Sequence, residues 1–191
     1  MEVEYLDGSK LFVIHGFFSP EECDRAIERS EQSGYADAPI TTAAGFLMRK
    51  DIRDNARVMN DDPDLAADLW QRARGLLAPE WFDWKLVGLN ERFRYYRYDV
   101  GQRFARHTDG YFERSNGERS HFTFMIYLND GFEGGATAFH YCRPSLLVTP
   151  KRGMALAFYH RLLHEGMPVV TGRKYVLRTD VMYRRASGRS A

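Results

Sequence analysis

Two short stretches of the sequence place nitrogen and oxygen ligands at a spacing that suits a metal ion. His107-Thr108-Asp109 carries an imidazole and a carboxylate two residues apart. On a strand, residues i and i+2 point to the same face, so both side chains can reach one ion. A second histidine, His164, lies much later in the chain, at the mouth of another expected strand. Together these residues predict a metal site that leaves coordination positions open.

The segment from Lys174 to Tyr183 places charged side chains on one face of an expected strand. Lys174, Arg178 and Asp180 share a parity, and the opposite face is mainly apolar. Charges on an inward face are costly unless they are paired or used, so this face should look into a cleft. One cation there could bind the distal carboxylate of a dicarboxylate that chelates the metal. Two histidines and one carboxylate are the ligand set of non-haem Fe(II) oxygenases.

Short strands are the elements that must position these residues. We expect them at 85–98 (one strand or two), 121–128, 136–141, 145–149, 154–159, 165–170 and 174–183. Gly-rich or Pro-containing turns separate them. Upstream, the segment KLFVIHGFF predicts a further short strand. Many short strands predict a sandwich or small barrel, with a jelly roll as the expected form.

Two helices are expected in the N-terminal part. Ser19-Pro20 with Glu22 has the pattern of a capping box, which predicts a helix to about Ser33. Asp62-Pro63 should open a second helix that ends before Pro79. Between them, residues 35–61 show no clear period and are expected to form a long loop.

The composition fits a single folded domain. The chain has 191 residues with 27 basic and 26 acidic side chains, and its 13 Phe, 11 Tyr and 3 Trp argue against disorder. We expect helical support in residues 1–83, the jelly-roll core in 84–185 and a frayed basic tail in 186–191. The two cysteines, Cys23 and Cys142, cannot build a disulfide framework or a thiolate cluster.

The same composition limits the expected partners and location. The formal net charge is +1, which gives no global reason to expect nucleic acid. No run approaches the ~20 apolar residues of a membrane span. The acidic, polar N-terminus does not have the pattern of a secretory signal. We therefore expect a cytoplasmic protein that binds neither membrane nor nucleic acid.

Six short segments between Asn90 and Tyr183 follow one another in the order of a known family. They are Tyr98-Asp99-Val100-Gly101, His107-Thr108-Asp109, Tyr127-Leu128-Asn129, Gly134-Gly135-Ala136-Thr137-Ala138-Phe139, His164-Glu165-Gly166 and Gly172-Arg173-Lys174-Tyr175-Val176-Leu177-Arg178. Each segment alone is unspecific. In this order, and with the spacing from His164 to Lys174, the stretch resembles the iron(II)- and 2-oxoglutarate-dependent dioxygenases of the prolyl 4-hydroxylase type.

The resemblance implies a fold and a metal site. The fold would be a double-stranded β-helix (jelly roll), mainly β with supporting N-terminal helices packed on one sheet. His107, Asp109 and His164 would bind Fe(II), and Lys174 would bind the C5 carboxylate of 2-oxoglutarate. Ascorbate is a further cofactor that the resemblance suggests.

Three more residues gain an implied role from the resemblance. Tyr127 matches a tyrosine that supports the C5 carboxylate, and Tyr98 matches one near the co-substrate. Thr137 lies in the Gly-Gly-x-Thr strand that borders the co-substrate. Without the resemblance, the two tyrosines would be read as core aromatics with a polar tip.

The implied reaction is hydroxylation of an aliphatic C–H with O2, releasing succinate and CO2. Because Asp109 fills the carboxylate position, hydroxylation is favoured over halogenation. A peptidyl proline or another protein side chain is the first substrate candidate, and a free amino acid or small metabolite is the alternative. A cupin-like dioxygenase without 2-oxoglutarate and a non-catalytic jelly-roll ligand-binding module are the competing classes.

Several residues keep two interpretations. Arg178 could contact 2-oxoglutarate or substrate, or could only pair with Asp180. The arginines between 92 and 106 could form a positive rim, but pairing with Glu91 and Asp99 on a solvated strand is favoured for most of them. Three residues of the 35–61 loop could contact substrate or could simply be exposed: Arg53, Asn55 and Arg57. Four histidines are interpreted as structural: His15, His121, His140 and His160.

Overall fold

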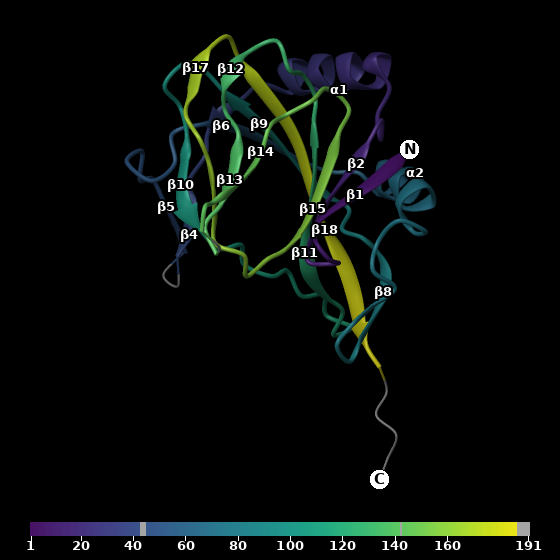
Figure 1. Ribbon diagram of the computed structural model, residues 1–191. Coiled ribbons are helices and arrows are strands. Elements are labelled where there is room, and N and C mark those ends of the chain that lie inside the picture. The colour runs from purple at the N-terminus through teal and green to yellow at the C-terminus, as the bar shows by residue number, and fades with distance from the viewer. Residues whose placement is uncertain (43–44, 142, 187–191) are drawn as a thin grey trace.

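The computed structural model describes residues 1–42, 45–141 and 143–186. Cys142 and residues 187–191, which include most of the expected basic tail, lie outside the described residues. The described chain folds into three layers: two helices, a large sheet and a small sheet (Figure 1).

The two helices begin where the sequence predicts. Helix α1 spans Pro20–Ser33, and its capping box is complete: the Glu22 amide donates to Ser19 Oγ at 3.2 Å, and the Ser19 amide donates to Glu22 Oε2 at 2.8 Å. Helix α2 spans Pro63–Ala73, where the Leu65 amide donates to the capping carboxylate of Asp62 at 2.9 Å. These caps satisfy amides that a helix start leaves without partners.

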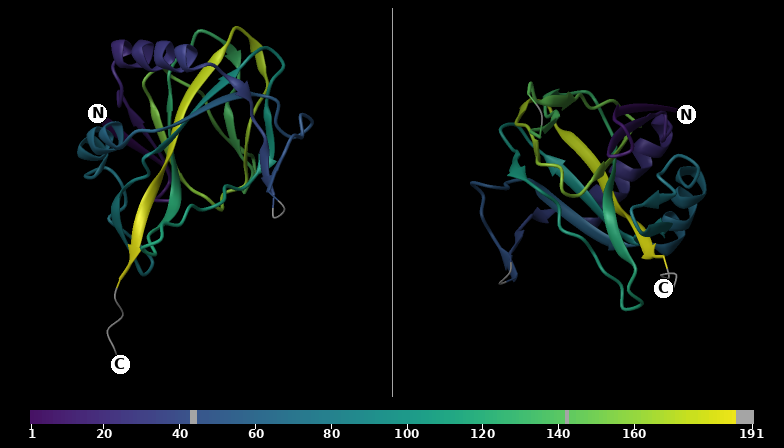
Figure 2. Two further views of the ribbon diagram at one scale, coloured as in Figure 1. Left: turned by 180° about the vertical axis from the view of Figure 1, so that it is seen from behind. Right: turned by 60° about the horizontal axis from the view of Figure 1, so that its bottom comes forward.

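The large sheet is antiparallel and ten-stranded. In spatial order its main path is β1 (Glu2–Asp7), β2 (Leu11–His15), β15 (Ala155–Tyr159), β11 (Arg119–Tyr127), β18 (Lys174–Arg185), β9 (Arg92–Tyr98), β6 (Ala56–Asp61) and β3 (Ala36–Asp37). Strand β8 (Trp84–Leu89) pairs with the far end of β18, and β7 (Glu80–Trp81) pairs with β8. Strand β18 therefore lies at the centre of the sheet, as Figure 2 shows from behind.

The small sheet faces the large one. Its order is β10 (Phe104–His107), β16 (His164–Gly166), β13 (Thr137–Phe139) and β14 (Leu146–Val148). Two short ladders complete the described structure: β12 (Glu133–Gly134) with β17 (Val169–Thr171), and β4 (Ile40–Thr42) with β5 (Gly45–Leu47). Two antiparallel sheets packed face to face with supporting helices confirm the expected jelly roll.

Alternation along the central strands divides the interior into two cores. On β18, Leu177 and Val181 join the core that packs under the helices, where Leu69 of α2 is also buried. Val176 faces the other way and joins the core between the sheets. In Figure 1 the helices accordingly lie on the side of the large sheet that is opposite the small sheet. The polar inner face predicted for 174–183 is therefore the face that looks into the jelly roll.

The expectation of a long loop at 35–61 is wrong. This segment forms β3, β4, β5 and β6, and β6 pairs with β9 over its whole length, from Ala56 opposite Arg97 to Asp61 opposite Arg92. Strand β6 has only one fully buried position, Val58, so its sequence lacks a clear apolar alternation. Pairing with a distant strand fixes its conformation.

Other differences are smaller. The segment 85–98 forms two strands, β8 and β9, which is one of the two expected forms, whereas 165–170 is divided between β16 and β17. Strands β1 and β10 were not expected. Within the residues that the structure describes, no helix has the length and apolar character needed to cross a membrane.

Candidate active site

His107, Asp109 and His164 converge between the two sheets. His107 ends β10, His164 opens β16, and the two residues are direct partners in the ladder between these strands. Asp109 follows two residues after β10, with its amide donating to the His160 carbonyl at 2.9 Å. One potential ligand atom from each of the three residues lies within 4.8 Å of the others. Residues from distant parts of the chain thus form the group predicted from the sequence.

The hydrogen bonds of both imidazoles direct one nitrogen toward this group. His107 Nδ1 lies 2.7 Å from the Ala105 carbonyl, and His164 Nδ1 lies 2.9 Å from the Leu162 carbonyl. A carbonyl only accepts, so each Nδ1 carries the proton and each Nε2 keeps its lone pair. Those Nε2 atoms lie 3.7 and 3.8 Å from the Asp109 carboxylate. Burial lowers the pKa of His164 to about 4, which keeps it neutral, as a metal ligand must be.

Asp109 is held in place through both of its oxygens. Arg178 Nη1 lies 2.9 Å from Oδ1, and Thr123 Oγ1 donates to Oδ2 at 2.5 Å. Burial alone would raise the pKa of Asp109, but the Arg178 guanidinium holds it well below its usual range. The carboxylate is therefore ionised and pre-oriented. Two neutral imidazoles and a carboxylate fit a divalent metal of the Fe(II) type.

Lys174 is a buried cation on the same inner face. It is 2% exposed, and its Nζ donates to the Gly135 carbonyl at 2.5 Å. The rings of Tyr98 and Tyr127 lie 5.2 and 5.4 Å from Nζ. Among the described residues it forms no ion pair, and burial lowers its pKa to about 7. A buried amine without a carboxylate partner is suited to bind an anionic ligand.

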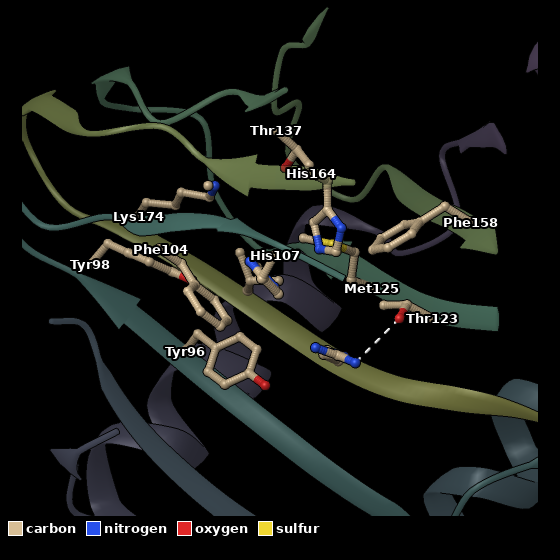
Figure 3. Close-up of a pocket in the computed structure, with 13 residues that line it drawn as sticks. Tyr96, Tyr98, Phe104, His107, Thr123, Met125, Thr137, Phe158, His164 and Lys174 are labelled. Atoms are coloured by element: carbon tan, nitrogen blue, oxygen red, sulfur yellow. Dashed lines mark hydrogen bonds between the residues drawn. The ribbon is translucent and has the colours of Figure 1, made fainter. Parts of the chain in front are cut away.

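The other residues with an expected cofactor role surround Lys174. Tyr127 and Thr137 share a hydrogen bond of 2.7 Å between their hydroxyl groups. Tyr98, Thr137 and Lys174 line one pocket with both histidines. Tyr127 is fully buried behind it. Figure 3 shows Lys174 and Tyr98 toward one end of this pocket, Thr123 toward the other, and His107 and His164 between them.

The pocket also contains residues that the sequence reasoning did not single out. Besides those already named, its walls are formed by Tyr96, Phe104, Thr123, Met125, Phe158, Gly166 and Val176. Thr123 is the most important omission because it bonds to Asp109 and accepts from Arg178 Nη2 at 3.2 Å, the dashed line in Figure 3. Its inward parity on 121–128, shared with Tyr127, is a signal that could have identified it.

Arg178 pairs mainly with Asp109, a partner that neither of its two interpretations included. Its Nη2 lies 3.5 Å from Asp180 Oδ1, whereas Arg94 Nη1 lies 3.0 Å from Asp180 Oδ2. Arg178 lines the pocket, so it is close enough to act on bound molecules.

Some of the histidines and arginines that were expected to be structural have clear hydrogen-bond or ion-pair partners. His160 is buried and bonds to Ser120 and Thr123, at 2.9 and 3.0 Å, rather than joining the metal group. The arginine run pairs only in part as expected: Arg97 lies 4.0 Å from Asp99, but Arg97 is closer to Glu31, at 2.9 Å, and Arg92 pairs with Asp61. These partners come from β6 and α1, which sequence proximity could not indicate.

Comparison with known proteins agrees with this geometry. Residues 93–179 match the model of the 2OG-Fe(II) oxygenase superfamily. Probable prolyl 4-hydroxylase 8 of Arabidopsis thaliana is 24% identical over 87% of this chain, and probable prolyl 4-hydroxylase 9 is 31% identical over 84%. The chain spans 66% and 64% of the lengths of these two relatives.

Solved structures share the fold. The viral collagen prolyl hydroxylase of Paramecium Bursaria Chlorella virus-1, in complex with 2OG, has a TM-score of 0.67 at 24% identity, covering 92% of this chain and 97% of that one. A Trichoplax adhaerens prolyl hydroxylase, in complex with a hypoxia inducible factor peptide fragment, has a TM-score of 0.70 at 18% identity, covering 92% and 84%. The resemblance expected from the sequence is confirmed: residues 93–179 match the 2OG-Fe(II) oxygenase superfamily, and the chain shares its fold with prolyl hydroxylases.

Proposed function

We propose that this chain is an Fe(II)- and 2-oxoglutarate-dependent dioxygenase that hydroxylates an aliphatic C–H bond and releases succinate and CO2. The observation that carries the proposal is that buried Lys174 lines the same pocket as His107 and His164, the two histidines that form the candidate metal group with Asp109. The two features match the two ends of 2-oxoglutarate, a dicarboxylate whose one end chelates a metal. The family match at 93–179 supports this assignment.

The residues have separate tasks in this mechanism. His107 and His164 would bind the metal through Nε2, and Asp109 through a carboxylate oxygen. When bound, Fe(II) supplies the oxidation chemistry together with 2-oxoglutarate and O2. Lys174 would hold the C5 carboxylate and so fix the orientation of the co-substrate.

The surrounding walls support this chemistry by excluding water and restricting motion. The Phe104 ring stacks on His107 with centroids 3.6 Å apart, and the Phe158 ring lies edge-on to His164 at 4.6 Å. These contacts fix both imidazole planes and cover them with apolar surface. A dry, rigid site limits side reactions of reactive species.

The substrate is the finer part of the proposal. A peptidyl proline or other protein side chain is supported by the names of the two relatives reported above, both of which are called probable prolyl 4-hydroxylases. A free amino acid or small metabolite is the second candidate, favoured by the cationic side chains beside the pocket that are described below. Ascorbate as a reductant and a cytoplasmic location complete the proposal, and both rest on sequence expectations alone.

The test starts with anaerobic addition of Fe(II) and 2-oxoglutarate to the full chain. A weak visible absorption band from the metal–2-oxoglutarate complex, followed by succinate formation when O2 is admitted, is the expected result. His164→Ala should abolish both signals, whereas His15→Ala, which removes a surface histidine paired with Glu4, should keep them. Formation of the band without succinate in the native chain would favour the non-catalytic binding module instead. Repeating the succinate assay with and without ascorbate tests the reductant.

A further inference from the structure

Four arginines gather on the inner face of the large sheet, beside the pocket. We call Arg53, Arg57, Arg94 and Arg178 the arginine cluster. In the ladders, Arg57 of β6 lies opposite Tyr96 of β9, and Arg94 lies opposite Arg178 of β18. Residues directly opposite each other in an antiparallel pair share a face. Because Tyr96 and Arg178 line the pocket, Arg57 and Arg94 belong to the same inner surface.

The cluster has more positive charge than its carboxylate neighbours can neutralise. Arg94 and Arg178 share Asp180, and Arg178 also pairs with Asp109. Four guanidinium groups therefore meet two carboxylates, and one of these, Asp109, would be used by the metal. Once Asp109 binds the metal, Asp180 is the one carboxylate among these ion pairs that is left to neutralise the arginines.

Two members of the cluster have guanidinium donors that no described residue satisfies. Arg53 is 5% exposed, donates from Nε to Asn55 Oδ1 at 2.8 Å and stacks on the rings of Tyr96 and Phe104, yet its Nη2 is buried without a partner. The Arg57 side chain is partly buried, and its guanidinium has neither a hydrogen bond nor an ion pair with any residue that the structure describes. A buried guanidinium nitrogen without a partner, such as Arg53 Nη2, is costly unless a ligand satisfies it.

The behaviour of Tyr96 supports a positive potential at this point. Burial would raise the pKa of the Tyr96 hydroxyl, but the guanidinium groups of Arg178, Arg53 and Arg94 outweigh burial and lower it. The site is thus arranged to stabilise negative charge beside the pocket wall.

The cluster is separate from the Lys174 site. Lys174 and Arg178 are four residues apart on β18 and face the same way, so their backbones are about 13 Å apart at the usual strand rise. The two histidines of the metal group lie between Lys174 and Thr123, and the Thr123 hydroxyl accepts a hydrogen bond from Arg178 (Figure 3). One anion-binding position is therefore available for the co-substrate and a second for another molecule.

We propose that the arginine cluster, with Arg57 as its free guanidinium, binds an oxyanion group of the substrate, a carboxylate or a phosphate. This inference rests on the proposed oxygenase function because it assigns Lys174 to 2-oxoglutarate and the cluster to the molecule that is hydroxylated. Guanidinium groups recognise both kinds of oxyanion by paired hydrogen bonds. A substrate held in this way is an acid, either free or as an acidic side chain next to the reacting residue.

The test measures binding rather than turnover, on the full chain loaded with Zn(II) and 2-oxoglutarate. The probes are two pairs that differ in charge alone: N-acetyl-L-proline with its amide, and a proline peptide that carries Glu with the same peptide carrying Gln. Affinities come from saturation-transfer NMR, and inorganic phosphate is added as a competitor. The variants are Arg57→Met, the charge-keeping Arg57→Lys, and Arg92→Met as a matched control from the same strand pair, where Arg92 pairs with Asp61 at the surface.

The expected result is a preference of about tenfold for at least one acid over its amide, as for a charge-assisted hydrogen bond. Arg57→Met should reduce this preference to about twofold or less, Arg57→Lys should keep part of it, and Arg92→Met should keep all of it. A preference for the acid in the N-acetylproline pair indicates that the substrate is a free acid. A preference for Glu over Gln in the peptide pair indicates that the substrate carries an acidic side chain. If phosphate displaces the acid at a concentration below the dissociation constant of the acid, the substrate is assigned as one that carries a phosphate.

Two results would overturn the proposal. One is a native chain that binds no acid more tightly than its amide, whether both bind or neither does. The other is an Arg57→Met variant that loses affinity for 2-oxoglutarate, because the cluster would then serve the co-substrate. Failure of the oxygenase assignment is separately visible: the Fe(II)-loaded chain would form no succinate, while the acid preference would persist in the Zn(II) form.

Discussion

Replacing Lys174 with methionine should have opposite effects on stability and on co-substrate binding. The methionine keeps much of the volume of the lysine stem and removes the ammonium, which is buried with only the Gly135 carbonyl as acceptor. If Lys174 binds the C5 carboxylate, the variant loses one charge-assisted hydrogen bond. Such a bond contributes about 1.5–3 kcal/mol, so the dissociation constant of 2-oxoglutarate should rise about 10- to 150-fold.

The stability effect follows from the pKa of this lysine. Burial lowers it from 10.5 to about 7, so between these values the unfolded chain binds more protons than the folded chain. The free energy of unfolding therefore rises with pH through this window, and the buried charge costs up to about 5 kcal/mol below it. Lys174→Met should be more stable than the native chain at pH 7, and its stability should lose this pH dependence.

The same pKa makes co-substrate binding depend on pH. Above pH 7 the free amine must take up a proton when the carboxylate binds, so affinity should fall by about tenfold per pH unit in the native chain. The assay is a titration of 2-oxoglutarate into the Zn(II)-loaded protein between pH 6.5 and 8.5, followed by calorimetry, with urea unfolding in parallel. Lys85→Met, at an exposed position of β8, is the control and should change neither quantity.

A weaker but equally pH-dependent affinity in Lys174→Met would show that another group carries the proton. An unchanged affinity would refute the anchor assignment. A variant that is less stable than the native chain would instead show that the ammonium is a structural hydrogen-bond donor rather than a ligand-binding group.

Three further outcomes are expected. Thr123→Val removes the hydroxyl that donates to Asp109 and should weaken Co(II) binding by about 10- to 100-fold in a spectroscopic titration; unchanged affinity would show that Arg178 alone orients the carboxylate. His164→Ala removes a proposed ligand and should weaken Co(II) binding further than Thr123→Val does, and a smaller loss in the same titration would contradict the ligand assignment. Ser19→Ala removes the helix cap and should lower the free energy of unfolding by about 1 kcal/mol in urea, with Co(II) affinity unchanged as the check that the site is not disturbed.

The features that the sequence could predict are those set by nearby residues. The capping box at Ser19 and Glu22 is a matter of three residues, and the structure contains it as expected. The two faces of β18 follow from strand alternation, which is a property of the chain itself. The spacing of His107 and Asp109 within one short segment likewise placed both side chains near one ion.

The features that escaped prediction depend on contacts between distant segments. Strand β6 is ordered by its pairing with β9, and nothing in its own composition indicates that partner. Arg178 of β18 pairs with Asp109, which follows β10 of the other sheet. Thr123 reaches the same carboxylate from β11. In each case the partner is decided by strand order in the sheet, which local patterns do not contain.

Strand β18 fixes the distance between the two cations of the site, Lys174 and Arg178. Its outer face is locked into the helix-side core by Leu177 and Val181, so its inner face cannot slide relative to the sheet. Lys174 and Arg178 are therefore held about 13 Å apart by the backbone itself. The two histidines of the metal group lie between Lys174 and Thr123, the hydrogen-bond partner of Arg178, which separates the position of the co-substrate carboxylate from that of a second anion. A substrate bound through the arginine cluster would present to the metal only those C–H bonds that lie a short, set distance from its oxyanion. Regioselectivity would then follow from strand geometry, even in a pocket whose walls are largely aromatic and unselective.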